Sequence, residues 1–283
     1  HQYDVYDYHQ SSPVVYKGAV YFGSGDGYLY AVNMGDGKQL WKFQTANVIH
    51  STPAISDDKL FFGSMDGYVY AINILNGRFI WKFKTVGHNY FPKGEVQFSP
   101  TVLYGTVFIG ARDYNLYAID VNTGVCHWNR EFPGGWVPAV TPSYKNDSLI
   151  YVETSDPLVL LAINGVTENT LWKTNMKSEV FGHCALSENM GYVGTLAGKF
   201  YGVDLKTGVI QWTIMTDGYS ANHLKYYKPD DTYRDDIFSI NKTNEDFIYS
   251  GYACGAIYST AAISAEAIII SSTDGTVYCL KRN

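Results

Sequence analysis

Short runs of apolar and aromatic residues, separated by turns rich in glycine and aspartate, divide this 283-residue chain into strands. In the first clear example the runs are 19–24, 28–33 and 40–45, with Asp26-Gly27 and Gly35-Asp36-Gly37 between them. Such runs between turn signals are typical of β-strands. Asp-Gly predicts a tight hairpin, because both central residues of a type I′ turn need a positive φ. A further run at 51–56 ends at Asp57-Asp58, so the pattern predicts four strands per unit.

The unit repeats at a period near 40 residues. Gly23–Asn33 is echoed almost letter for letter by Gly63–Asn73, and a tryptophan follows eight residues after each asparagine. The same spacing recurs at 120/128, 164/172 and 204/212, and a sixth copy lies at 272–280. Four strands in about 40 residues are typical of a β-propeller blade. The sequence therefore predicts an all-β propeller of six four-stranded blades, in one domain over 1–283.

Two features decide the blade count. Aligning Ser12-Pro13-Val14 with Thr52-Pro53-Ala54 makes Tyr3–Tyr8 the fourth strand of the last blade, which closes the ring. Closure covers strand edges that would otherwise stay unpaired. Residues 213–255 break the repeat and are interpreted as an insertion, with a seventh, degenerate blade as the alternative. A smaller insertion lies at 85–97.

Composition narrows the classes of partner. The net charge of −6 and the pI of about 5.6 argue against binding to nucleic acid. No run of 18 apolar residues is present, so no membrane-spanning helix is expected. The four cysteines form no CxxC pair, which argues against a zinc site. Cys279 takes an alanine position of the repeat and is expected to be a buried thiol, whereas pairing of Cys184 with Cys254 stays open.

The unit Tyr-Ala-(Ile/Val)-(Asn/Asp)-x-x-x-Gly-x-x-x-Trp resembles the repeat of the pyrroloquinoline-quinone (PQQ) β-propeller family. It is complete at 30–41, 70–81 and 117–128, and Glu168 replaces its glycine in the fourth copy. The Trp-Asp dipeptide of WD40 repeats is absent. The resemblance, which extends over the chain outside 213–255, implies that the tryptophans dock between neighbouring blades. These are Trp41, Trp81, Trp128, Trp172 and Trp212.

The resemblance implies two classes of function. Quinoprotein alcohol dehydrogenases have eight blades, adjacent cysteines, a calcium site and a catalytic aspartate, whereas this chain has fewer predicted blades and no adjacent cysteines. Family members of similar size are not enzymes, and include a periplasmic lipoprotein that assists outer-membrane protein assembly and extracellular sensor or scaffold domains. We therefore expect no catalytic residues and no cofactor; the alternative is PQQ with Ca²⁺.

Aligned positions at the start of the innermost strands predict a polar ring at the channel mouth. They read Ser12, Thr52, Ser99, Thr141, His183 and Thr260, and the positions two residues earlier include Gln10, His50, Gln97 and Tyr258. The candidate binding residues are His183, His50, Gln10, Gln97, Tyr258, Thr52 and Thr260. Alternatively, the hydroxyls bond only to inner-strand backbone and channel water. The hairpin aspartates are interpreted as turn residues.

The insertion is the second candidate site. Long loops in compact folds are usually functional or disordered, and tyrosine is enriched at protein interfaces. His223, Tyr226, Tyr227 and Tyr233 are therefore candidate partner-binding residues. Four aspartates lie within 230–236. They match the oxygen ligands of a hard cation, but their spacing fits no EF-hand, and a solvated acidic loop is the alternative.

The sequence thus predicts a non-catalytic scaffold that binds a protein or cell-envelope partner through the rim that carries the insertion. A periplasmic or extracellular location is expected, with a signal or neighbouring domain trimmed. The first alternative is a PQQ-dependent oxidoreductase, or another propeller enzyme, that uses the channel mouth. The second is the propeller domain of a longer chain, serving as a sensor or substrate-presenting module.

Overall fold

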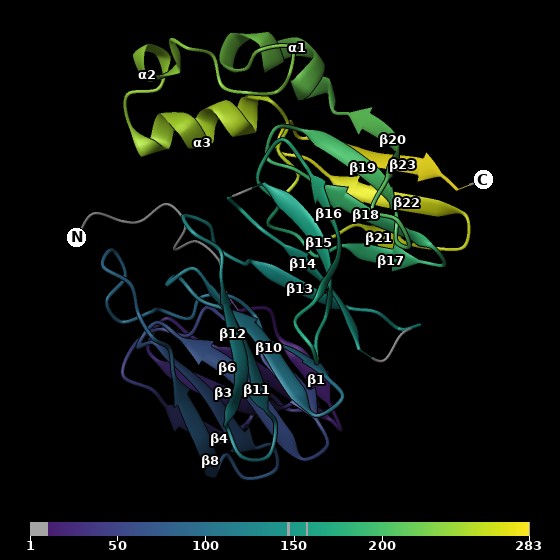
Figure 1. The fold of residues 1–283 in the computed structure, drawn as a ribbon. Coiled ribbons are helices and arrows are strands. Elements are labelled where there is room, and N and C mark those ends of the chain that lie inside the picture. The colour runs from purple at the N-terminus through teal and green to yellow at the C-terminus, as the bar shows by residue number, and fades with distance from the viewer. Residues whose placement is uncertain (1–10, 146–147, 157, 283) are drawn as a thin grey trace. The chain divides into compact units, whose positions relative to one another are not determined.

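Six antiparallel sheets follow one another along the chain, which confirms the predicted six-bladed, all-β propeller (Figure 1). The computed structural model describes residues 11–145, 148–156 and 158–282. Five sheets have four strands, and the sixth has three among the described residues. The predicted closing strand, Tyr3–Tyr8, lies outside the described residues.

The strands of each blade pair in chain order. Blade 1 contains β1 (Val14–Tyr16), β2 (Ala19–Gly23), β3 (Tyr28–Asn33) and β4 (Gln39–Gln44). Blade 2 contains β5 (Ala54–Ser56), β6 (Lys59–Ser64), β7 (Tyr68–Asn73) and β8 (Phe79–Lys84). Blade 3 contains β9 (Thr101–Leu103), β10 (Thr106–Gly110), β11 (Asn115–Asp120) and β12 (Cys126–Glu131).

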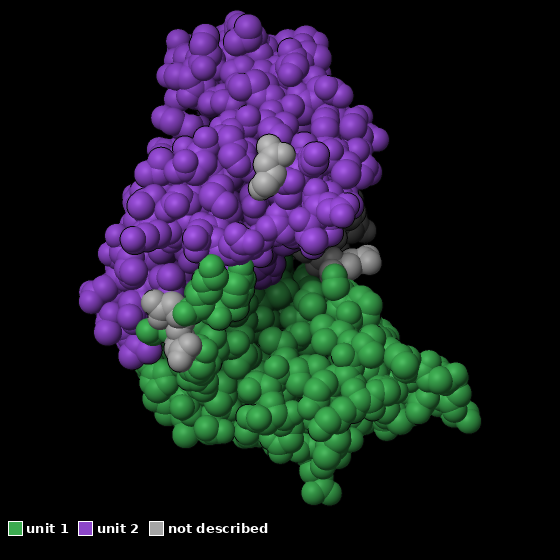
Figure 2. Space-filling view, turned by 90° about the vertical axis from the view of Figure 1, so that its right-hand side faces the viewer, with its two compact units in different colours: residues 1–148 green, residues 149–283 purple. Residues whose placement is uncertain are grey.

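The second half continues the pattern. Blade 4 contains β13 (Ala139–Pro142), β14 (Leu149–Glu153), β15 (Val159–Asn164) and β16 (Thr170–Asn175). Blade 5 contains β17 (Ala185–Ser187), β18 (Met190–Gly194), β19 (Lys199–Asp204) and β20 (Ile210–Met215). Blade 6 contains β21 (Ala262–Ile263), β22 (Ala267–Ser271) and β23 (Val277–Lys281). The chain divides into two compact units, residues 1–148 and 149–283, drawn in two colours in Figure 2.

The Asn/Asp of the repeat makes the turn between the third and fourth strands. Asn33 Oδ1 accepts hydrogen bonds from the backbone N–H groups of Gly35 and Asp36, at 2.8 and 3.2 Å. Gly37 follows with a φ of 70°, a conformation that glycine adopts without strain. Glu168 takes that position in the fourth copy and still has a φ of 63°. The turn thus keeps its geometry after losing its glycine.

Three of the repeat tryptophans join one blade to the next. The indole Nε1 of Trp41 donates to the backbone oxygen of Ile74, and that of Trp81 donates to Val121, both at 3.1 Å. Trp172 makes the same contact with Leu205 at 2.9 Å. Each indole also contributes buried area to the packing between blades. The fixed distance of the tryptophan from the Asn/Asp of its own repeat therefore positions the indole to contact the following repeat.

Two details differ from the sequence predictions. The strand predicted over 51–56 begins only at Ala54, because Ser51 accepts the Gly63 N–H and the Thr52 N–H donates to Ser99 instead of to a sheet partner. Cys279 is exposed, not buried. The equivalent residue in blade 1, Ala31, is covered because β3 pairs with a fourth strand at Trp41. Cys279 lies on β23, which has no fourth strand beside it among the described residues.

Residues 216–255 form a helical insertion, not a seventh blade, and residues 213–215 of the predicted insertion belong to β20. The insertion contains α1 (Asp217–Tyr226), α2 (Ile237–Ile240) and α3 (Asn244–Ala253), and α1 packs beside α3 (Figure 1). Thr216 caps α1 by accepting the Tyr219 N–H, and its hydroxyl donates to the backbone oxygen of Cys254 at 2.9 Å. The insertion, which connects blade 5 to blade 6, therefore begins and ends at neighbouring points. No helix among the described residues is long and apolar enough to span a membrane.

Candidate functional site

The predicted ring of hydroxyls serves the joints between blades. The Ser12 N–H donates to Thr52 Oγ1, and the Thr52 N–H donates to Ser99 Oγ, each at 3.0 Å. In the second unit, the His183 N–H donates to Thr260 Oγ1 at 3.0 Å. Each of these bonds connects one blade with the next. These hydroxyls therefore accept hydrogen bonds from backbone N–H groups, in agreement with the alternative that they bond to inner-strand backbone.

The other channel-mouth candidates occupy different environments. His50 is partly buried, and Gln97 is only 2% exposed. Tyr258 is partly buried, with its ring 6.1 Å from that of Phe181. Gln10 lies outside the described residues. The structure therefore brings Thr52 together with Ser12 and Ser99, and His183 with Thr260.

In three hairpins the aspartate accepts a hydrogen bond from the hydroxyl of the tyrosine four residues later, a pair that we call an Asp–Tyr clamp. Tyr117 OH donates to Asp113 Oδ2 at 2.5 Å, and the same pair occurs at Asp26/Tyr30 and Asp66/Tyr70. Asp113 Oδ2 also accepts a hydrogen bond at 3.0 Å from the N–H of Gly87, which lies in the loop between β8 and β9. These carboxylates are hydrogen-bonded within the fold, as expected for turn residues.

In the insertion, four aromatic rings form a continuous stack. Tyr219, His223 and Tyr227 follow one another at intervals of four residues, with ring centroids 4.1 and 5.3 Å apart. Tyr233 stacks on Tyr227 at 5.0 Å, where an isolated β-bridge joins the two residues. The interval of four places the first three rings on one face of α1 and its C-cap. His223 and Tyr227 are buried, so they form the interior of the insertion, whereas Tyr226 is partly exposed and Tyr233 is exposed.

Asp231 is a buried carboxylate at the centre of this module. Lys199 Nζ from β19 lies 2.5 Å from Oδ2, and Tyr219 OH donates to Oδ1 at 2.8 Å. His223 Nε2 lies 2.9 Å from Oδ1, an ion-pair separation without the alignment of a hydrogen bond. A buried carboxylate requires such partners. Asp231 thereby links the insertion to blade 5.

Burial and charge shift the pKa values in this cluster. Burial lowers the pKa of His223 below its ordinary 6.5; the charge of Lys199 acts in the same direction, and Asp231 opposes both. Burial and the hydrogen bond to Asp231 raise the pKa of Tyr219. Burial also raises the pKa of the Cys254 thiol, to about 11. At neutral pH the histidine, the phenol and the thiol are therefore uncharged.

The remaining aspartates of 230–236 have separate partners. Asp235 pairs with Lys228 at 2.5 Å, and Arg234 donates two hydrogen bonds to Asp236, both at 2.8 Å. Asp230 accepts from the Thr232 hydroxyl and N–H. Within 11–145, 148–156 and 158–282 no three His, Cys, Asp or Glu side chains gather as a metal site would require. The aspartates of this loop are therefore not arranged as the ligands of a hard cation.

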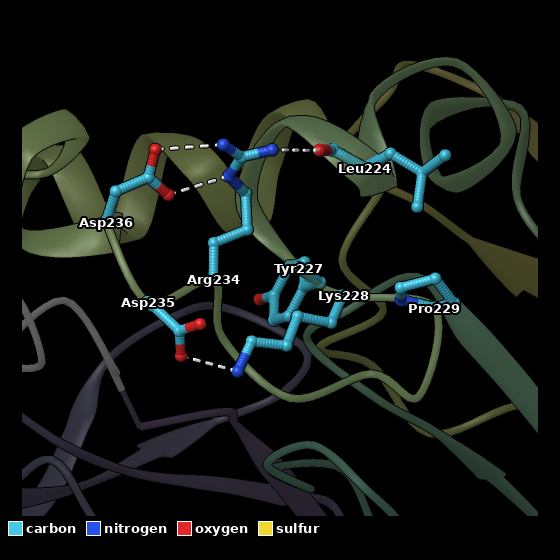
Figure 3. Close-up of a pocket in the computed structure, with 7 residues that line it drawn as sticks. All are labelled: Leu224, Tyr227, Lys228, Pro229, Arg234, Asp235 and Asp236. Carbon is cyan, nitrogen blue, oxygen red and sulfur yellow. Dashed lines mark hydrogen bonds and ion pairs between the residues drawn. The ribbon is translucent and has the colours of Figure 1, made fainter.

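These ion pairs border a hollow of about 500 Å³ (Figure 3). Leu224, Tyr227 and Pro229 give it apolar walls, and the Lys228/Asp235 and Arg234/Asp236 pairs form its charged margin. Arg234 is held in place because it also donates to the backbone oxygen of Leu224 at 3.3 Å. An apolar hollow with a charged margin suits an apolar side chain inserted by a partner.

Comparison with known proteins identifies the family. A family model described as outer membrane protein assembly factor BamB matches residues 5–159 and 134–242. The chain belongs to this family of PQQ-repeat propellers. A search of curated protein sequences finds no significant match.

Solved structures related to this family member share its fold. The computationally designed Ika8 protein has a TM-score of 0.69 and 16% identity, covering 96% of this chain and 71% of its own. BamB from Moraxella catarrhalis has a TM-score of 0.57 and 16% identity, covering 97% and 83%. Quinohemoprotein alcohol dehydrogenase from Comamonas testosteroni has a TM-score of 0.62 and 16% identity, but the match covers 73% of this chain and 42% of the dehydrogenase. At these identities the similarity establishes the fold alone.

The insertion of this PQQ-repeat protein also carries exposed apolar side chains, of which Leu224 lines the hollow. Phe238 is 78% exposed, Tyr249 is 65% exposed and Leu224 is 63% exposed. Tyr233, Ile240 and Tyr252 are also exposed. We call these six residues the insertion surface: Leu224, Tyr233, Phe238, Ile240, Tyr249 and Tyr252.

Sequence reasoning named only Tyr233 of this surface. The signal for α3 was available, because Thr243 and Asp246 form a capping box that marks a helix start. A helix starting there places Tyr249 and Tyr252 three residues apart on one face. Phe238 and Ile240 lie in the short α2, for which the sequence offers no comparable signal.

Proposed function

We propose that this protein is a non-catalytic scaffold that binds a protein partner through its helical insertion. The insertion surface supports the proposal most directly, because large exposed apolar side chains gathered on one module mark interaction sites in soluble proteins. Tyrosine and phenylalanine are enriched at such interfaces. The adjoining hollow offers a place for an apolar anchor from the partner.

We propose the cell envelope as the site of action, in the periplasm or outside the cell. The support is membership of a family whose description names an outer membrane protein assembly factor. The partner is accordingly proposed to be an envelope protein.

Capture of an envelope partner tests the proposal. Immobilised wild-type protein and the variants Phe238→Asp and Tyr249→Asp are incubated with solubilised envelope proteins, and the retained proteins are quantified. Leu75→Asp is the matched control, since Leu75 is 72% exposed in a turn of blade 2. We expect the same retained protein with wild type and Leu75→Asp and at least a tenfold loss with the insertion variants. Equal retention by all four proteins refutes the proposal.

The proposal assigns no resident cofactor. A thermal titration with PQQ, with and without calcium, is therefore expected to leave the Tm unchanged. A ligand present at 100 times its Kd stabilises a protein by about 2.7 kcal/mol. A rise in Tm that His183→Ala abolishes would instead support the quinone-dependent alternative at the channel mouth.

A further inference from the structure

The attachment of the insertion to blade 5 depends on one buried charge cluster. Lys199 belongs to the blade, while Asp231, Tyr219 and His223 belong to the insertion. Lys199 also lies over the Tyr219 ring, 4.9 Å from its centroid. With His223 neutral, the positive charge of Lys199 and the negative charge of Asp231 balance.

His223 has little access to water that would solvate a positive charge. It is 5% exposed, and its ring lies between those of Tyr219 and Tyr227. Protonation would leave two cations facing one carboxylate inside the module. A buried charge without its own counter-charge is costly, so the protonated cluster favours an arrangement that admits water.

We propose that protonation of His223 releases residues 224–236 from blade 5, so that the insertion is an acid-sensitive module. The released segment contains Asp231, and with it the contact to Lys199. Segments that open locally are those with few anchoring contacts. The base of the insertion stays attached, because the N–H groups of Asp217 and Gly218 donate to Tyr278 OH and Asp274 Oδ2, at 2.7 and 3.0 Å.

The direction of the pH effect follows from linkage. The folded-state pKa of His223 lies below its ordinary 6.5, so the released form binds the proton more tightly. Docking is therefore fully stable above about pH 6.5, weakens as the pH falls from there toward the lower folded-state pKa, and changes no further below it. The docking equilibrium changes by about tenfold for each pKa unit between the two states.

Other titratable groups face the same cluster. Tyr201, Tyr219 and Tyr227 have raised pKa values, mainly because they are buried, and stay uncharged between pH 5 and 8. Burial also raises the pKa of Glu179, which interacts with Tyr227. A raised carboxyl pKa stabilises the docked form in acid, so Glu179 opposes the effect of His223. The remaining neighbours are Lys199, Asp231, Cys254, Tyr233 and Lys225.

The consequence for partner binding rests on the proposed function. Tyr227, Lys228 and Arg234 line the hollow, and all three lie within the released segment. Acid would therefore dismantle the hollow and release the bound partner.

Hydrogen exchange of the isolated protein tests the release without any partner, so its failure is separate from failure of the scaffold proposal. Amide protection over 224–236 is measured between pH 5 and 8 and corrected for the intrinsic pH dependence of exchange. The variants are His223→Gln, the reverse-sign control Glu179→Gln and the matched control His127→Gln, whose imidazole is exposed on β12.

We expect protection to fall in acid in wild type and His127→Gln, and to fall further in Glu179→Gln. In His223→Gln, where Glu179 still titrates, protection should hold or rise in acid. Protection in β6 should not change. Constant protection in wild type, or the same acid loss in His223→Gln, overturns the proposal. If His223→Gln does not fold, NMR titration of the His223 ring in wild type decides: a midpoint at or above 6.5 in the docked form removes the cause of release and also overturns the proposal.

Discussion

The indole of Trp81 lies against Gly124 of the following blade: a Cβ placed on Gly124 would be 2.8 Å from Cδ2 of that ring. Gly77 meets Trp41 in the same way, and Gly208 meets Trp172. The glycine and the tryptophan of the repeat are therefore partners across a blade joint. Their fixed spacing in the sequence encodes contact between successive repeats.

Replacing Gly124 tests this partnership. Gly124→Ala combines a left-handed backbone, which costs about 1–2 kcal/mol, with displacement of a packed indole, which costs about 1–3 kcal/mol. We expect a loss of about 2–5 kcal/mol in the free energy of unfolding, measured in urea. Gly37→Ala is the control, because Gly37 has a φ of 70° but no atom within 4 Å of the added methyl group. Equal losses in both variants would show that the indole contact is unimportant.

The Asp–Tyr clamps should stabilise the fold according to their burial. Tyr117→Phe removes the hydroxyl that bonds the buried Asp113 carboxylate and accepts the Val86 N–H. We expect a loss of about 1.5–3 kcal/mol, as for a buried hydrogen bond to a charged group. Tyr30→Phe breaks the equivalent bond to Asp26 at the surface and should cost much less. A larger loss from Tyr30→Phe would contradict the argument.

The exposed Asp26–Tyr30 pair can also be tested through the pKa of Asp26. The Tyr30 hydroxyl is the main cause that holds the pKa of Asp26 below its ordinary 3.8. Its stabilising effect is present above pH 3.8 and is lost as the pH falls through the folded-state pKa. In Tyr30→Phe, NMR titration should show the Asp26 pKa rising toward 3.8. An unchanged pKa would mean that the hydroxyl does not act on this carboxylate.

The hydroxyls that connect neighbouring blades should matter for stability. Thr52→Val keeps the shape of the side chain but removes the acceptor for the Ser12 N–H. We expect a loss of about 0.5–1.5 kcal/mol in the free energy of unfolding, the net contribution of one hydrogen bond, because water can replace the lost acceptor at this exposed site. Thermal denaturation of Thr52→Val beside Thr52→Ser, which keeps an acceptor, measures the difference. Equal melting temperatures would leave the hydroxyls free for another function.

The insertion should be removable without loss of the fold. Thr216 bonds to Cys254 across its base, so a short Gly-Ser linker can replace residues 220–250. We expect the shortened chain to keep its β-sheet circular dichroism and a cooperative melting transition, and to lose partner capture. Capture that survives the deletion would place the interface elsewhere.

Sequence reasoning predicted the fold well because each repeat carries its own turn chemistry and five of the six carry their own tryptophan. Asn33, Gly37 and Trp41 are visible as a pattern before any contact is known. The joints between blades were harder to foresee, since the Ser12–Thr52 bond connects residues 40 positions apart. That bond could be expected only from the aligned hydroxyls, and its meaning stayed open between ligand site and blade joint.

The insertion is unique in the chain, so no repeat guides its interpretation. The Lys199–Asp231 pair spans 32 residues and depends on the path of 217–236 across blade 5. His223 and Tyr227 read as surface residues in the sequence, yet the four-residue interval stacks them in the interior. The exposure of Phe238 on α2 and of Tyr249 on α3 is visible only in the structure.

The central claim is that the insertion surface meets the partner. A photo-crosslinking amino acid placed singly at Phe238, Thr260 or Leu75 of the full chain, followed by irradiation in intact cells, tests it most directly. The account predicts one dominant crosslinked protein from position 238 and none from 75 or 260. Crosslinks from position 260, at the predicted channel mouth, with none from 238, would contradict it.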